Sequence, residues 1–225
     1  MSSLSFQAII FDLDGLVLDS EITYFAAWQQ AAASMGHVLD EAFCASLSGL
    51  HGTAVYQRLR KQCGADFDEA SFKALSRQCW LDYLKTHGMP VKPGFFELLQ
   101  VIEEQKYAFC LATNSRREDA EFCLQAAGLG DVFDTVITRD DVLRGKPSPA
   151  IFHTAAARLG LSSADCLVLE DSPVGVAAAY AAEAPCIFVP SRYPIDPLAA
   201  LQAHGVLKDL AEVADFVSAI GSHPL

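Results

Sequence analysis

Short apolar runs alternate with helical patterns along much of the chain. The runs are nearly continuous and rich in β-branched and aromatic residues, which is typical of strands buried on both faces of a sheet. They cover residues 6–12, 107–113, 135–138, 166–170 and 186–189. Helical patterns cover residues 94–105, 116–127, 149–159 and 173–182, a proline-containing loop is expected at 191–198, and a last helix from residue 206 onward. This alternation predicts an α/β fold with a Rossmann-like, doubly wound parallel sheet.

One connection is much longer than a strand-helix-strand unit requires. The first strand ends near Asp12 and the second begins near Tyr107, whereas a complete unit needs about 30 residues. The intervening segment has helical periodicity, with Tyr24, Trp28, Ala31 and Met35 on one face. We therefore expect a helical cap of roughly three or four helices over residues 19–88, inserted into a core made of residues 1–18 and 89–225. Glycine and proline at the junctions favour hinges that would let the cap move as a lid.

Composition and charge narrow the class of protein. The formal net charge of −12 argues against sequence-independent nucleic-acid binding. The longest apolar run, residues 174–182, is far shorter than the roughly 20 residues of a membrane helix. The first residues show neither a basic segment nor a small-residue cleavage site, so nothing indicates export. The seven cysteines lack C-x-x-C spacing, as is typical of reduced, buried thiols. We expect a cytoplasmic protein with no nucleic-acid or membrane partner.

The first apolar run ends in the sequence FDLDG, which places Asp12 and Asp14 where the chain leaves the sheet. Open α/β sheets bind ligands at the carboxyl ends of their strands. Carboxylates buried close together need a cation, a hydrogen-bond network or a shared proton, and a divalent metal ion is the natural candidate. An exposed edge strand is the alternative, but the preceding residues AIIF favour a central strand. The spacing and the preceding strand also differ from a calcium-binding EF-hand.

A second acidic pair follows another predicted strand, in the sequence LVLEDSPVG. A serine or aspartate followed by Pro173 is typical of a helix N-terminus, so Asp171 could be a cap or a metal ligand. Capping does not explain Glu170. If both acids face the same crevice as the first pair, four carboxylates would meet there, which favours Mg²⁺.

Two further segments could contact a phosphate group. In LATNSRRE, Thr113 and Asn114 offer a hydroxyl and an amide near a helix N-terminus, where phosphate binds readily. Ser115 and Glu118 have capping-box spacing, which predicts a structural role for Ser115. In RGKPSP, Lys146 lies in a loop stiffened by prolines and could neutralise a phosphate. A solvated loop lysine is the alternative.

Taken together and in this order, FDLDG, ATNS, GKPSP and LVLEDSPVG resemble the four motifs of the haloacid dehalogenase superfamily, in its β-phosphoglucomutase-like phosphatase branch. The resemblance covers nearly the whole chain, including a helical cap inserted after the first motif. It implies that Asp12 attacks phosphorus in line and forms an aspartyl-phosphate, while Asp14 acts as general acid and base.

The same resemblance implies roles for the other motif residues. Thr113, Asn114 and Lys146 would bind and orient the phosphoryl group. Mg²⁺ would be held by Asp12, Asp171 and the main-chain carbonyl of Asp14, with Glu170 nearby. The expected function is a Mg²⁺-dependent phosphatase of small phosphorylated metabolites, sugar phosphates first of all. We expect a small-molecule phosphate ester as the partner, and a monomer.

A phosphosugar mutase is the main alternative. Where β-phosphoglucomutase has a histidine on the first cap helix, this chain has Tyr24, and the matching loop, residues 48–52, ends in glycine in place of an arginine. Both departures favour hydrolysis, because a mutase must hold a bisphosphate and resist water. Tyr24 and His51 are candidate substrate-binding residues of the cap, although the loop that holds His51 could also be a mere interhelical turn.

Other members of the superfamily fit less well. A true dehalogenase has no need of a second acid, yet Asp14 is present. A phosphonatase requires a lysine early in the inserted segment, yet the first lysine of the sequence is Lys61. A binding or regulatory module that keeps the fold without turnover would have little reason to retain Asp12, Asp14, Lys146 and Asp171 together.

Overall fold

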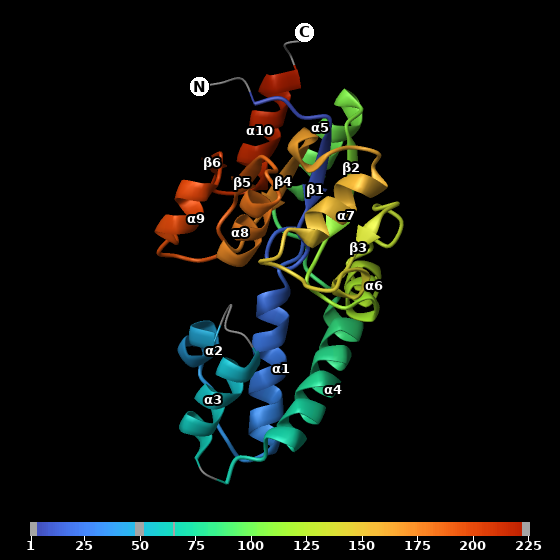
Figure 1. Cartoon of the computed structure of the whole chain (residues 1–225). Helices are drawn as coiled ribbons and strands as arrows, with labels where there is room; N and C mark the ends of the chain where they lie inside the picture. Colours follow the sequence, from blue (N-terminus) through green and yellow to red (C-terminus); the bar gives the residue numbers. More distant parts are fainter. Residues whose placement is uncertain (1–3, 48–51, 65, 222–225) are drawn as a thin grey trace. The chain divides into compact units, whose positions relative to one another are not determined.

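The computed structural model describes residues 4–47, 52–64 and 66–221, and the chain divides into two units (Figure 1). The first, called the α/β unit below, consists of Met1–Leu18 and Pro90–Leu225. The second, the helical unit, consists of Asp19–Met89. The helical unit therefore interrupts the α/β unit shortly after its first strand.

The α/β unit is built on one parallel sheet with the strand order β3-β2-β1-β4-β5-β6. The strands are β1 (Ala8–Phe11), β2 (Ala108–Ala112), β3 (Val136–Ile137), β4 (Cys166–Glu170), β5 (Cys186–Phe188) and β6 (Gly205–Val206). In the centre, Ile10 of β1 pairs with Cys110 on one side and Val168 on the other. The α/β fold and five of these strands confirm the prediction from the apolar runs, and β6 was not predicted.

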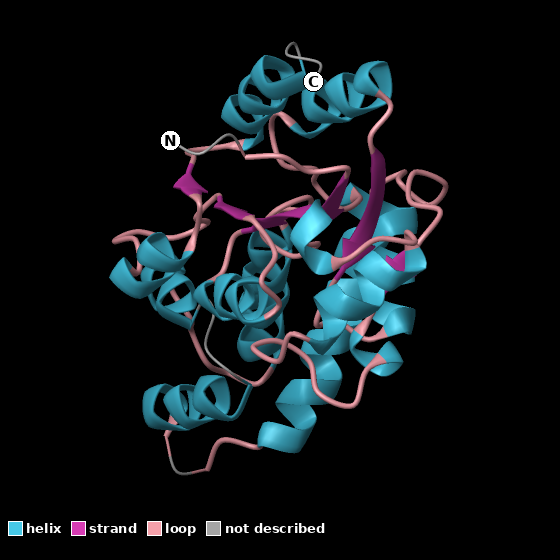
Figure 2. Cartoon of the chain, turned by 45° about the horizontal axis from the view of Figure 1, so that its top comes forward, coloured by secondary structure: helices cyan, strands magenta, loops and turns pink. Residues whose placement is uncertain are grey.

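Helices cover both faces of this sheet (Figure 2). They are α5 (Phe95–Gln105), α6 (Arg117–Ala126), α7 (Ala150–Arg158), α8 (Pro173–Ala181), α9 (Pro197–Gln202) and α10 (Leu210–Gly221), with short 3-10 turns at Arg139–Asp141 and Ser163–Asp165. On one face Ile10 packs in a cluster with Phe152 of α7 and Val176 of α8. On the other, Phe11 meets Phe95 of α5 edge to face, at 6.0 Å between ring centroids. Burial on both faces explains why the strands are almost wholly apolar.

The helical unit contains α1 (Ser20–Ser34), α2 (Glu41–Leu47), α3 (Gly52–Cys63) and α4 (Glu69–His87). These helices follow β1 and confirm the predicted helical insertion. On α1, Thr23 and Ala27 are buried, whereas Tyr24 and Trp28 are half-buried. The indole N–H of Trp80 on α4 donates to Thr23 Oγ1 at 3.0 Å. Small side chains on α1 make room for that ring, and Tyr24 stacks on it at 5.2 Å between centroids.

Two predictions about the chain's environment can be compared with the structure. In the described part of the chain, no helix is long and apolar enough to cross a membrane. All seven cysteines are free thiols, and all but the half-buried Cys63 are buried. Burial raises the pKa of Cys44 to about 11 and that of Cys110 to about 12, so these thiols are protonated and unreactive at neutral pH.

Candidate active site

Four functional candidates lie at the carboxyl ends of neighbouring strands. Asp12 follows β1, Thr113 lies just beyond β2, and Glu170 ends β4 with Asp171 directly after it. The Asp12 amide donates to Leu169 O at 3.1 Å and the Thr113 amide to Ile137 O at 2.9 Å, so the ladder runs one residue past the strands. Since β2, β1 and β4 are adjacent in the sheet, these residues meet at one edge, as expected for the ligand site of an open α/β sheet.

Lys146 lies at the centre of this group. Its ammonium donates to Asp12 Oδ1, to Glu170 Oε1 at 2.5 Å and to Ala112 O at 2.9 Å. Three acceptors use all three donors of an ammonium group. The side chain is 3% exposed, and that of Glu170 is fully buried. A solvated loop lysine, the alternative considered from the sequence, is therefore wrong.

Three carboxylates of the group can approach a single cation. Oxygen atoms of Asp12, Glu170 and Asp171 lie within 4.8 Å of one another, and all three residues are buried. The carboxylates outnumber the ammonium group among them, so the cluster carries excess negative charge. Carboxylate oxygens are the donors that hard divalent cations prefer. The donor set and its charge therefore fit a divalent metal ion.

The electrostatics of the two central groups reflect their burial. Burial raises the pKa of Asp12 well above its ordinary value, Lys146 opposes that rise, and the charges of Glu170 and Asp171 add to it. Burial lowers the pKa of Lys146, but the negative charges of Asp12 and Glu170 outweigh it and raise that pKa overall. Lys146 therefore stays charged, and Asp12 gains from any further positive charge placed beside it.

Helix α8 supports Glu170 through its first turn. The Ser172 hydroxyl donates to Glu170 Oε2 at 3.1 Å and accepts from the Gly175 amide at 3.1 Å. A Cβ atom on Gly175 would overlap the Glu170 carboxylate, so a residue without a side chain is needed there. Ser172 is thus the helix cap, with Pro173 in the first turn. Asp171 is therefore not the cap of α8, and its role as a metal ligand stays a prediction.

The side chain of Asp14 is held by Ser115. The Ser115 hydroxyl donates to Asp14 Oδ2 at 2.7 Å, and the Ser115 amide donates to Thr113 Oγ1 at 3.0 Å. The capping-box prediction for Ser115 is wrong, because α6 begins at Arg117 with Arg116 as its cap residue. Ser115 instead links two site residues. The main-chain carbonyl of Asp14 stays a predicted metal ligand.

Asn114 holds the main chain of Lys146. Its Oδ1 accepts from the Lys146 amide at 2.8 Å, and its Nδ2 donates to the Lys146 carbonyl at 3.2 Å. A Cβ atom on Gly145 would overlap Asn114 Oδ1, so glycine lets the two segments approach. Arg139 supports the same loop by donating to Val142 O at 2.7 Å. The pairing gives Asn114 a positioning role that its place in the sequence did not reveal.

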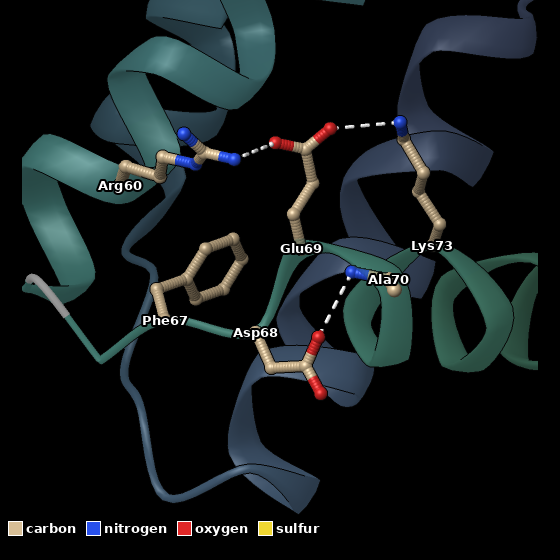
Figure 3. A pocket seen from close by; sticks show the side chains of 6 residues that line it. All are labelled: Arg60, Phe67, Asp68, Glu69, Ala70 and Lys73. Carbon is tan, nitrogen blue, oxygen red and sulfur yellow. Dashed lines mark hydrogen bonds and ion pairs between the residues drawn. The ribbon is translucent and has the colours of Figure 1, made fainter.

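The two cap candidates, Tyr24 and His51, belong to the helical unit. Tyr24 is half-buried in α1 and stacks on Trp80, and His51 lies outside the described residues. A pocket of about 470 Å³ in the helical unit is lined by Arg60, Phe67, Asp68, Glu69, Ala70 and Lys73 (Figure 3). There Glu69 accepts from Arg60 at 2.9 Å and from Lys73 at 2.8 Å. The Arg60–Glu69 pair ties α3 to α4, and the Lys73–Glu69 pair lies within α4, so both have a structural role.

Comparisons with known proteins agree with this geometry. Residues 9–189 match the haloacid dehalogenase-like hydrolase family. The chain is 29% identical to validoxylamine A 7'-phosphate phosphatase of Streptomyces hygroscopicus subsp. limoneus, over 92% of this chain and 96% of that protein. It is 30% identical to β-phosphoglucomutase of Bacillus subtilis strain 168, over 76% and 78%.

A solved structure is similar as well. It is a haloacid dehalogenase family hydrolase from Deinococcus radiodurans R1 with bound phosphate and sodium. Its sequence is 27% identical, the alignment covers 97% of each chain, and the TM-score is 0.81.

Proposed function

Because this chain belongs to the haloacid dehalogenase-like hydrolases and is a phosphatase of that family, we propose that it hydrolyses small phosphorylated sugars with Mg²⁺, through a phosphorylated Asp12. The observation that carries the proposal is the buried group of Asp12, Lys146, Glu170 and Asp171 at the carboxyl edge of the sheet. Relatives named for phosphate esters support the reaction, and the resemblance to β-phosphoglucomutase supports a sugar phosphate as substrate.

In the first step a carboxylate oxygen of Asp12 attacks phosphorus, and the bond from phosphorus to the ester oxygen breaks. The departing oxygen takes a proton from Asp14, which acts as general acid. Lys146 stays charged between Asp12 and Glu170 and orients the attacking carboxylate. The Thr113 hydroxyl accepts a hydrogen bond from the Ser115 amide, and it would donate a hydrogen bond to a phosphoryl oxygen of the substrate.

In the second step water attacks the phosphorus of the aspartyl-phosphate. Asp14 takes the proton from that water, and the Asp12 carboxylate leaves as phosphate forms. Ser115 holds the Asp14 carboxylate for both transfers. Asn114 contributes by fixing the main chain of Lys146, and direct contacts of Asn114, Tyr24 and His51 with the substrate stay predictions.

Asp12, Asp171 and the main-chain carbonyl of Asp14 would hold the metal ion, with Glu170 nearby. When bound, Mg²⁺ screens the negative charges of Asp12 and the phosphoryl group as they approach each other.

Release of phosphate from an aryl phosphate tests the proposal. We expect the wild-type protein to need Mg²⁺, so that a chelator stops the reaction and added Mg²⁺ restores it. The Asp12→Asn variant should lose activity by about 10⁴-fold or more, since a nucleophile is removed. Asp134→Asn is the matched control, because Asp134 is exposed on the surface, and it should keep wild-type activity. Retained activity in Asp12→Asn would show that Asp12 is not the nucleophile.

The substrate and the competing mutase reaction need a second assay. A panel of phosphorylated metabolites should show the largest release of free phosphate from sugar phosphates. A hexose 1-phosphate supplied with a trace of bisphosphate should likewise yield free phosphate. If the isomeric sugar phosphate is the main product instead, the protein is a mutase.

A further inference from the structure

We propose that Ser191 is a positioning residue of the metal site, whose hydroxyl holds the Asp171 carboxylate in the orientation that binds the ion. The inference rests on the function proposed above, since it takes Asp171 to be a metal ligand. Ser191 belongs to the segment between β5 and α9 and lies outside all four sequence motifs.

The register of the sheet brings Ser191 to this place. Glu170 of β4 pairs with Phe188 of β5, and the Val189 amide donates to Glu170 O at 2.7 Å. Two residues further along, the Ser191 hydroxyl donates to Asp171 Oδ2 at 2.6 Å. This hydrogen bond therefore joins Asp171, directly after β4, to the loop that follows β5, the neighbouring strand.

The same carboxylate oxygen packs against the main chain of Gly15. A Cβ atom on Gly15 would overlap Asp171 Oδ2, whereas Oδ1 would lie 3.5 Å away. Gly15 has a φ of +86°, a conformation that favours glycine. Asp171 Oδ2 is thus held between a hydroxyl donor and a closely packed backbone. Rotation of this buried carboxylate would break the hydrogen bond to Ser191.

A neutral donor suits this position. Asp12 and Glu170 are oriented by the ammonium group of Lys146, which compensates their charge as well. A hydroxyl group orients a carboxylate without adding a positive charge that would compete with the metal ion. Outer partners of metal ligands typically change metal affinity by about 10- to 100-fold when they are removed.

Calorimetric titration with Mg²⁺ alone, without substrate, tests the inference. Ser191→Ala should bind Mg²⁺ about 10- to 100-fold more weakly than the wild-type protein. Ser162→Ala is the matched control, because Ser162 donates to Asp165 Oδ2 at the same 2.6 Å on an exposed turn, and it should keep wild-type affinity. The variants Ser191→Thr and Ser191→Val are nearly isosteric and differ in having a hydroxyl or a methyl group. The Ser191→Thr variant should therefore bind Mg²⁺ at least about tenfold more tightly than Ser191→Val.

Each outcome has a distinct meaning. Equal affinities of Ser191→Ala and the wild-type protein would overturn the inference, as would equal affinities of the Thr and Val variants. The Thr and Val pair decides the matter if Ser191→Ala does not fold. If the wild-type protein itself binds no Mg²⁺, that result contradicts the proposed metal-dependent function, and the inference about Ser191 is then wrong as well. Weaker binding in Ser162→Ala, equal to that in Ser191→Ala, would also contradict a role specific to Ser191.

Discussion

The two units each contain a lysine paired with carboxylates, in opposite settings. In the α/β unit, Lys146 lies between Asp12 and Glu170, and the three side chains are 3%, 10% and 0% exposed. In the helical unit, Lys73 and Arg60 share Glu69 (Figure 3). The side chains of Lys73, Arg60 and Glu69 are 51%, 63% and 24% exposed. The ion-pair chemistry is similar, but only the first group is shielded from water.

We propose that this difference in burial separates a reactive site from a structural contact. Buried charges feel each other strongly, and each depends on its partners because water cannot replace them. Exposed ion pairs are solvated and screened by salt, so each charge is stable without its partner. The buried group can therefore hold a carboxylate in a state that reacts, whereas the exposed group helps to join α3 to α4.

The largest effect is expected for Lys146→Met. Removal of the ammonium group leaves Asp12 and Glu170 buried without their shared cation, which typically destabilises a protein by about 3–5 kcal/mol. The free energy of unfolding of the metal-free protein, from urea denaturation followed by circular dichroism, measures this loss. A loss no larger than that of Lys73→Met, the same substitution in the helical unit, would contradict the importance of burial.

An intermediate effect is expected for Asp141→Asn. Asp141 Oδ2 accepts from the Thr138 amide at 2.7 Å and from Arg117 at 2.6 Å, and the side chain is 24% exposed. A neutral amide accepts these hydrogen bonds more weakly than the charged carboxylate does, which costs about 1 kcal/mol. Burial raises the pKa of Asp141, but the hydrogen bonds from Thr138 and the charge of Arg117 lower it overall.

The direction of that pKa shift makes the Asp141 effect depend on pH. A lowered folded-state pKa contributes stability above the ordinary value of 3.8, and that contribution is lost as the pH falls through the folded-state pKa. We expect wild type and Asp141→Asn to differ at pH 7 and to converge in strong acid. A difference in unfolding free energy that is independent of pH would rule out the carboxylate's charge as its source.

The smallest effect is expected for Lys73→Met. The substitution removes the ion pair of Lys73 with Glu69 and the contact of the ammonium group with the Tyr56 ring, 4.2 Å from its centre. Water can then hydrate the Glu69 carboxylate, because this group is partly exposed. Both tryptophans of the chain lie in the helical unit, so tryptophan fluorescence reports its unfolding. We expect the smallest change in unfolding midpoint of the three variants, fading as salt rises towards about 1 M. A change as large as that of Lys146→Met would erase the contrast between the two groups.

The sheet and its acidic edge could be predicted because short-range signals specify them. Strands buried on both faces are apolar throughout, and β4 begins and ends where its apolar run does. Because the carboxyl ends of parallel strands meet at one edge of the sheet, the sequence alone predicts that Asp12 and Glu170 lie close together. The helix α9 has six residues, which is too few for a periodic signal. The strand β6 consists of Gly205 and Val206, which do not form an apolar run.

The supporting contacts could not be predicted, since they depend on which loops meet in space. Ser191 reaches Asp171 and Asn114 reaches Lys146 across 20 and 32 positions of sequence. Ser115 has capping-box spacing with Glu118, yet the helix begins at Arg117 and the hydroxyl bonds to Asp14. Spacing alone does not tell a cap from a tertiary contact that uses the same hydroxyl.

Chemical trapping of phosphorylated Asp12 tests the central claim most directly. The Asp14→Asn variant should accumulate the intermediate from an aryl phosphate, because the aryl oxygen leaves without a proton while water attack lacks its base. After an acid quench, borohydride reduces an aspartyl-phosphate to homoserine, which peptide mass spectrometry locates. We predict homoserine at position 12 in the presence of Mg²⁺. Continued turnover with an unmodified position 12, or homoserine at another position, would contradict the account.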